Sequence, residues 1–217
     1  MKVTTDACLF GAFSADKKLP AKAVLDIGGG TGLLTLMLAQ KMPAQLYTIE
    51  KDDDAFRQME QNVDVSPWKE RIHIIHGDIL EYDFEQRFDF VITNPPFYEN
   101  ELRSPDTRKN MAMHDVTLTL EKLVVILEEL VSESGSFGIL LPYFRSAAFI
   151  NLAADHGFYL QEHLQVRQTT RHGFFRSMLL FSRVPSETVV QELSIKDENG
   201  NYHEAFRHLL KDYYLYL

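Results

Sequence analysis

Four consecutive residues, Asn94, Pro95, Pro96 and Phe97, have the types and the order needed to hold a planar amine. They follow the apolar run 88–93, which predicts that they lie at the carboxyl end of a strand. The asparagine side-chain oxygen and a proline backbone carbonyl can each accept one N–H, while the aromatic ring stacks on the plane. This arrangement suits methylation of a poorly nucleophilic –NH2, such as adenine N6 or an amide nitrogen. The structural alternative is a strand that ends at a proline stop.

A glycine-rich turn comes earlier in the chain, directly after Asp26. Gly28, Gly30 and Gly32 would let the backbone approach a ligand without interference from Cβ atoms. The turn is expected between a strand and a helix, where a doubly wound sheet binds nucleotides. The dinucleotide fingerprint requires a third glycine at the position of Leu33, so a nicotinamide enzyme is disfavoured. A purely structural turn is the alternative.

Two acids follow later predicted strands. Glu50 ends the second strand, where a carboxylate can accept both hydroxyls of a ribose. Asp78 follows the third strand, and its side chain could accept the amino group of an adenine. The alternatives are a solvated acid for Glu50 and a helix N-cap for Asp78.

Apolar strand-like runs alternate with helical patterns along the chain, which predicts a parallel sheet with crossover helices. The fold class expected is α/β, with a late strand pair that commonly forms an antiparallel edge. Strands are expected at 23–27, 46–49, 72–75, 88–93, 137–141, 160–168 and 177–184, and helices at 33–41, from 52 onward, from 120 to before Gly135, at 144–156 and near 204–211.

The 217 residues fit one domain, 1–217, in which about 186–217 would form a small appendage. No membrane span or signal peptide is apparent, so a cytoplasmic protein is expected. The single Cys8 excludes a disulfide framework, and His114 and Asp115 lack a third ligand at usable spacing. No metal is therefore expected, and the oligomeric state stays open.

The charge is uneven. The net charge of −9 argues against a general nucleic-acid binder. The range 143–183, however, holds five arginines and only two acids. One face could therefore meet a polyanion.

Asp26, the glycine turn, Glu50, Asp78 and the Asn-Pro-Pro-Phe motif occur in this order, each at a predicted strand end. Together they resemble the pattern of S-adenosylmethionine-dependent methyltransferases of the Rossmann-like, seven-stranded class I. The resemblance implies that Glu50 binds the ribose of S-adenosylmethionine, that Asp78 meets its adenine, and that the glycine turn lies under its amino-acid part.

The N-terminal segment 1–12, MKVTTDACLFGA, resembles the start of the tRNA(Val) adenine-N6-methyltransferase family, and 194–202 and 209–214 resemble its ending. Members of that family methylate the adenosine that adjoins the anticodon. Cys8 and Phe10 replace the aliphatic residues expected, and the family's short aromatic and basic segment before MKV is absent.

The resemblance implies an enzyme acting on tRNA, in which Thr4 to Asp6 lie beside the methyl-donor pocket. Asn94 and the Pro95 carbonyl would orient the exocyclic nitrogen, and Phe97 would stack on the base; no general base of high pKa is required. Cofactor contacts are assigned to Thr5, Asp26, Gly28, Gly30, Gly32, Glu50, Asp78 and Asn94, and phosphate contacts to Arg103, Arg108, Lys109, Arg167, Arg171 and Arg176. Solvated surface charge is the alternative for each basic residue.

Other amines remain open from the motif alone. Glutamine-N5 protein methyltransferases and guanine-N2 rRNA methyltransferases use similar turns, but their usual extra domains find no room in this chain. A cofactor-binding RNA scaffold without catalysis is a further alternative, which the intact Asn-Pro-Pro-Phe turn disfavours.

Overall fold

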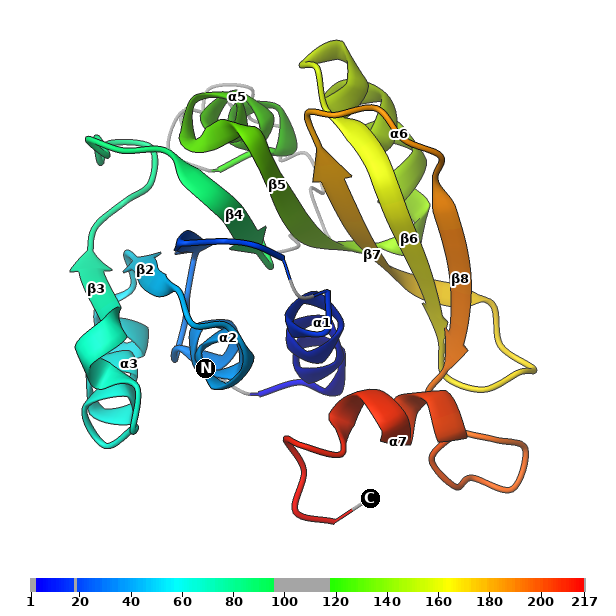
Figure 1. Cartoon of the computed structure of the whole chain (residues 1–217). Coiled ribbons are helices and arrows are strands. Elements are labelled where there is room, and N and C mark those ends of the chain that lie inside the picture. Colours follow the sequence, from blue (N-terminus) through cyan, green and yellow to red (C-terminus); the bar gives the residue numbers. More distant parts are fainter. Residues whose placement is uncertain (1–2, 18, 96–117, 217) are drawn as a thin grey trace, which may run out of the picture.

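The computed structural model describes residues 3–17, 19–95 and 118–216, and a single eight-stranded sheet runs through it (Figure 1). The strand order is β3-β2-β1-β4-β5-β7-β6-β8. All neighbouring strands pair in parallel except at β7, which is antiparallel to both β5 and β6. The strands are β1 (Ala23–Ile27), β2 (Gln45–Glu50), β3 (Ile72–His76), β4 (Phe88–Thr93), β5 (Val131–Pro142), β6 (Tyr159–Arg167), β7 (Phe174–Ser182) and β8 (Val189–Ser194).

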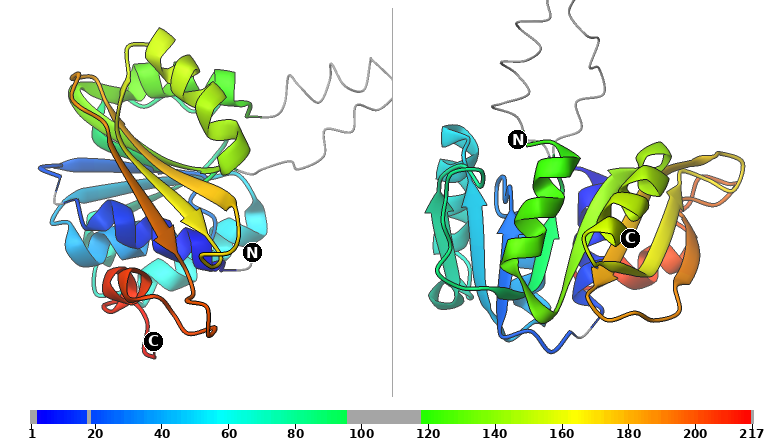
Figure 2. Two further views of the ribbon diagram at one scale, coloured as in Figure 1. Left: turned by 90° about the vertical axis from the view of Figure 1, so that its right-hand side faces the viewer. Right: turned by 90° about the horizontal axis from the view of Figure 1, so that it is seen from above.

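Helices cover both faces of the sheet, which gives three layers (Figures 1 and 2). One face carries α1 (Thr5–Ala15), α2 (Leu33–Lys41), α3 (Asp53–Asp64) and α7 (Glu204–Leu210), and the other carries α5 (Leu120–Leu130) and α6 (Tyr143–Asp155). A short 3-10 helix, Lys69–Arg71, leads into β3. None of the helices in these described ranges combines the length and apolarity needed to cross a bilayer.

Each face of the sheet has its own apolar core. Phe10 and Leu38 are fully buried between the sheet and the helices of the first face. On the second face, the Phe137 ring stacks on Phe181 with centroids 4.8 Å apart and meets Phe158 edge-on at 4.9 Å. β5 and β7 each pair with a strand on both sides, and burial of these rings stabilises the packing of this face.

The predicted bounds of 23–27, 33–41 and 88–93 agree with β1, α2 and β4, and the mostly parallel α/β sheet is confirmed. Two features of the sheet differ from prediction. The described residues form eight strands where seven were predicted, because β8 pairs in parallel with β6 within the segment expected to be an appendage. The antiparallel strand β7 is inserted between β5 and β6 and does not form the edge.

The parallel register brings the ends of four strands to one edge of the sheet. Ile27 of β1 lies opposite both Ile49 of β2 and Thr93 of β4, and Glu50 lies opposite His76 of β3. The segments that follow these strands are therefore neighbours, although they are far apart in sequence. Ligands of open α/β sheets bind at this edge.

Candidate active site

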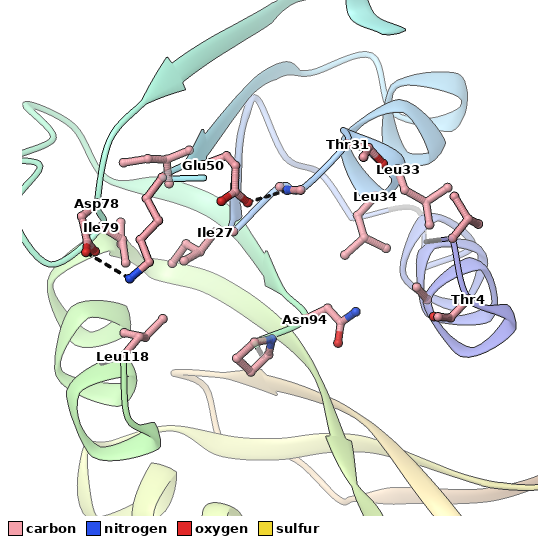
Figure 3. Close-up of a pocket in the computed structure, with 18 of the residues that line it drawn as sticks. Thr4, Ile27, Thr31, Leu33, Leu34, Glu50, Asp78, Ile79, Asn94 and Leu118 are labelled. Carbon is pink, nitrogen blue, oxygen red and sulfur yellow. Dashed lines mark hydrogen bonds and ion pairs between the residues drawn. The ribbon is translucent and has the colours of Figure 1, made fainter. Parts of the chain in front are cut away.

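A cavity of about 410 Å³ opens at the carboxyl edge of the sheet (Figure 3). This volume lies within the range typical of small-molecule sites. The lining comes from the start of α1, the glycine turn and the start of α2, the ends of β2, β3 and β4, the residue Leu118 before α5, and the start of β7. It consists of Val3, Thr4, Asp6, Ala7, Ile27–Thr31, Leu33, Leu34, Ile49, Glu50, Lys51, Gly77, Asp78, Ile79, Asn94, Pro95, Leu118 and Arg176. In Figure 3, Asp78 and Thr4 lie on opposite sides of the cavity, with Glu50 and Asn94 between them.

The glycine turn forms one wall, and its shape requires glycine. Gly28, Gly30 and Gly32 have φ values of 73°, 59° and 83°, in the left-handed region that other L-residues rarely adopt. A Cβ at Gly29 would lie 2.0 Å from Thr48 Oγ1, so this residue too must be glycine, which the sequence reading missed. A Cβ at Gly28 would meet nothing within 4 Å and would project into open space beside the cavity.

Glu50 is held at the end of β2 by backbone donors. Its Oε2 accepts a hydrogen bond from Gly30 N and its Oε1 from Asp52 N, both at 2.8 Å. The residue is only 7% exposed, yet it lines the cavity. A carboxylate oxygen has two acceptor sites, so each oxygen keeps one for a ligand. Two such acceptors side by side fit the vicinal hydroxyls of a ribose.

Asp78 lines the opposite part of the cavity, at the start of a tight turn. Its Oδ1 accepts from Leu80 N at 3.0 Å, and its Oδ2 lies 3.3 Å from Lys51 Nζ (Figure 3). No helix follows Asp78 in the described residues before β4, so the alternative of a helix N-cap is wrong: the side chain closes a turn and at the same time lines the cavity. Lys51 also lines the cavity, although it is not among the predicted site residues.

Asp26 lies beneath the turn and does not line the cavity. It is 1% exposed, and its Oδ2 accepts from Thr35 N at 3.1 Å and from Thr35 Oγ1 at 2.7 Å. Burial, together with the nearby Glu50 charge, raises the pKa of Asp26 to about 7 against the Thr35 hydrogen bonds. Within the described ranges its Oδ1 has no hydrogen-bond partner. Gly32, at the start of α2, is likewise absent from the cavity lining.

Asn94 and Pro95 leave β4 directly into the cavity. Thr93, the last residue of the strand, donates from its Oγ1 to Ile27 O at 3.0 Å and so ties the end of β4 to β1. Asn94 is half-buried and Pro95 is buried. Pro96 and Phe97 lie outside the described residues.

An ion pair joins α1 to β7 at the cavity. Arg176 Nε donates to Asp6 Oδ2 at 2.8 Å, and both residues line the cavity. Despite the desolvation that opposes it, the Arg176 charge and hydrogen bonds from Thr4, Arg176 and Ala7 hold the pKa of Asp6 below its usual value. Thr5 is outside the lining, although Thr4 and Asp6 on either side belong to it. Arg176, predicted to contact phosphate, is thus placed at the cavity.

Two other predicted phosphate contacts, Arg167 and Arg171, are not among the residues that line the cavity. Arg167 pairs with Glu192 and Arg171 with Glu198, each at 3.0 Å. Arg103, Arg108 and Lys109 lie outside the described residues. In the described part of the chain, no three His, Cys, Asp or Glu side chains are grouped so that they could hold a metal ion.

The strand order, the glycine turn and the acid at the end of β2 define an S-adenosylmethionine-dependent methyltransferase of class I, and the cavity residues fit that cofactor. Comparison with known proteins specifies the class further. Residues 7–121 match the family model of the methyltransferase small domain. The tRNA1(Val) (adenine(37)-N6)-methyltransferase of Dyadobacter fermentans is 40% identical, with 99% of this chain and 91% of the relative covered. The protein of the same name from Pseudoalteromonas translucida is 37% identical, with 99% of this chain and 92% of the relative covered. The one from Proteus mirabilis is 35% identical, with 100% of this chain and 88% of the relative covered. The chain belongs to the family of these methyltransferases.

Solved structures establish the fold independently. A predicted O-methyltransferase of Agrobacterium tumefaciens superposes with a TM-score of 0.71, at 14% identity and 95% coverage of both chains. The glycopeptide N-methyltransferase MtfA, in complex with S-adenosylmethionine, gives a TM-score of 0.59 at 11% identity, with 82% of this chain and 93% of that chain covered.

Proposed function

We propose that this protein transfers a methyl group from S-adenosylmethionine to the N6 amino group of an adenosine in tRNA, next to the anticodon of a valine tRNA. The observation that carries the proposal is the placement of Asn94 and Pro95, which project from the end of β4 into the cavity between Glu50 and the start of α1. Relatives of 35–40% identity that bear this activity in their name support the choice of amine.

Some residues of the cavity would bind the cofactor, and others would act on the target amine. Glu50 would accept the ribose hydroxyls, and Asp78 would accept the adenine amino group, with Lys51 giving up its contact. The open space beside Gly28 would take the amino-acid part. When bound, S-adenosylmethionine supplies an electrophilic methyl group on a sulfonium.

Asn94 and Pro95 act on the target nitrogen. The Asn94 side-chain oxygen and the Pro95 carbonyl would each accept one N–H of the amine, which orients the nitrogen lone pair and increases its electron density. Phe97 would stack on the base. The proton of the methylated amine leaves to solvent, so no side chain with a perturbed pKa is required at this point.

The same proposal covers the organisation of the chain and its site of action. We treat 1–217 as one domain, since β8 pairs with β6 and α7 packs against α1. A cytoplasmic location follows from a tRNA substrate.

The test is methylation of RNA by wild type and by Asn94→Ala. Wild type, incubated with labelled S-adenosylmethionine and RNA from a strain lacking the enzyme, should form N6-methyladenosine in a valine tRNA. Asn94→Ala should lower kcat by about a hundredfold or more, the scale of losing one preorganised hydrogen-bonding group. Its affinity for S-adenosylhomocysteine should stay unchanged.

Asn151→Ala, an exposed asparagine on α6, is the matched control and should retain full activity. Label in guanine of the RNA would instead identify an N2 enzyme, and label in glutamine of a protein extract from the same strain, incubated in parallel, would identify a protein methyltransferase. Equal turnover in Asn94→Ala would remove Asn94 from catalysis.

A further inference from the structure

Aromatic and arginine side chains gather beside the cavity, at the carboxyl edge of the sheet. β5 and β6 run parallel to β4 and end at this edge, so α6 begins here and β7 starts here (Figure 2). The start of α6 reads Tyr143-Phe144-Arg145, and the start of β7 reads Phe174-Phe175-Arg176. We call Tyr143, Phe144, Arg145 and Phe174 the edge surface.

Phe144 is the most unusual member of the edge surface. Its side chain is 76% exposed, and it is the only exposed phenylalanine in the described part of the chain. The rings of Tyr143 and Phe174 are half-buried, and their centroids are 5.2 Å apart. A single exposed apolar side chain is common on protein surfaces, whereas an apolar patch marks a contact site, and here the exposed ring follows directly on Tyr143, whose half-buried ring lies beside that of Phe174.

Arginine side chains alternate with these rings. The guanidinium carbon of Arg145 is 5.7 Å from the Phe144 ring centroid, and that of Arg167 is 5.2 Å from the Phe174 centroid. Arg167 is also paired with Glu192 at 3.0 Å. Its positive charge is thus partly compensated, and its planar group stays against the ring. The edge surface therefore offers flat stacking faces with a modest positive charge.

The edge surface is continuous with the active-site cavity. Pro142, which precedes Tyr143, lies opposite Arg176 in the β5–β7 register. Arg176 is 5.3 Å from the Phe175 ring and lines the same cavity as Asn94. A polymer whose reacting unit enters the cavity would therefore run its next unit over the edge surface.

We propose that the edge surface stacks a nucleotide that neighbours the target adenosine in single-stranded RNA, with Phe144 as the main platform. This inference rests on the proposed function and explains how the enzyme would recognise the anticodon loop of the tRNA instead of a free base. Proteins hold splayed single-stranded nucleotides by stacking them on aromatic rings and guanidinium planes. The combination of exposed ring, adjacent guanidinium and continuity with the cavity matches that requirement.

Steady-state kinetics on an unmodified valine tRNA transcript test the proposal. Phe144→Ala should raise KM for the transcript about tenfold, the scale of losing one base stack, while kcat changes less. Phe144→Trp should restore the wild-type KM. Stacking releases few counterions, so the ratio of the two KM values should stay the same as salt is raised. Affinity for S-adenosylhomocysteine should not move.

Tyr159→Ala is the matched control, because Tyr159 is 43% exposed and begins β6 at the opposite edge of the sheet. It should leave KM at the wild-type value. If wild type is active and Phe144→Ala has an unchanged KM, the stacking role of the edge surface is overturned, while the proposed function is unaffected. Wild type that methylates no tRNA overturns both. If Phe144→Ala without RNA sediments differently from wild type, Phe144 contacts a second copy of the chain, and the proposal is overturned.

Discussion

Replacing Asp26 by asparagine should change how the stability of the apo protein depends on pH. Burial raises the pKa of Asp26 to about 7 in the folded chain, against an ordinary value of 3.8. Between these values the folded protein holds a proton that the unfolded chain has released. The free energy of unfolding therefore falls as pH rises through this window, and it changes no further from this group above pH of about 7.

The magnitude follows from the width of that window. One pH unit inside it costs up to about 1.4 kcal/mol of stability. An asparagine side chain cannot titrate. The difference in free energy of unfolding between Asp26→Asn and wild type should therefore shift in favour of the variant by about 2 to 3 kcal/mol from about pH 5 to pH 8. The asparagine oxygen can still accept from Thr35. Its amide nitrogen would lie where Asp26 Oδ1 has no described partner, at a pH-independent cost of about 1 to 3 kcal/mol.

Urea unfolding of both proteins at the two pH values, without cofactor, measures the difference directly. Titrations elsewhere in the molecule are common to both proteins and cancel. Asp83→Asn, at an exposed acid between β3 and β4, controls for the loss of one charge. A gap between wild type and Asp26→Asn that is equal at both pH values would refute a proton held by Asp26.

Two further predictions concern the cofactor and the fold. Glu50→Ala should weaken binding of S-adenosylhomocysteine about a hundredfold by calorimetry, because two charge-assisted acceptors are lost. The control is Asp54→Ala, which should bind as tightly as wild type because the Asp54 side chain is 95% exposed. Equal affinities of Glu50→Ala and wild type would exclude Glu50 from the ribose site. Arg71→Met should lower the free energy of unfolding by about 2 to 3 kcal/mol in urea, because Arg71 donates to three backbone carbonyls at and just after the end of α2. Arg57→Met, 70% exposed, is its control, and a loss equal to the control would contradict the reasoning.

The parts of the fold that could be predicted are those with local signals. β1 and β4 are short apolar runs bounded by the glycine turn and by Asn94, and parallel strands bring their carboxyl ends together by geometry. For that reason Glu50, Asp78 and Asn94, read separately along the chain, lie in one cavity.

The parts that were missed lack a periodic pattern or depend on distant partners. α1 is buried from Ala7 to Ala15, so no polar face marks it as a helix beyond its start. β8 is an edge strand whose first residues are exposed, and its pairing with β6 decides its structure. Asp6 and Arg176 are 170 positions apart, so no local reading pairs them. Gly29 requires glycine only because Thr48 approaches it.

The span of the cavity lining has a consequence for the growing chain. The lining begins at Val3 and ends at Arg176, which sits on a strand that pairs with both β5 and β6. A nascent chain cannot complete the cavity on the ribosome until β7 has emerged and entered the sheet, although the glycine turn and Asn94 are made much earlier. Full cofactor binding thus depends on assembly of nearly the whole sheet, and the bound cofactor should oppose global unfolding as well as local opening.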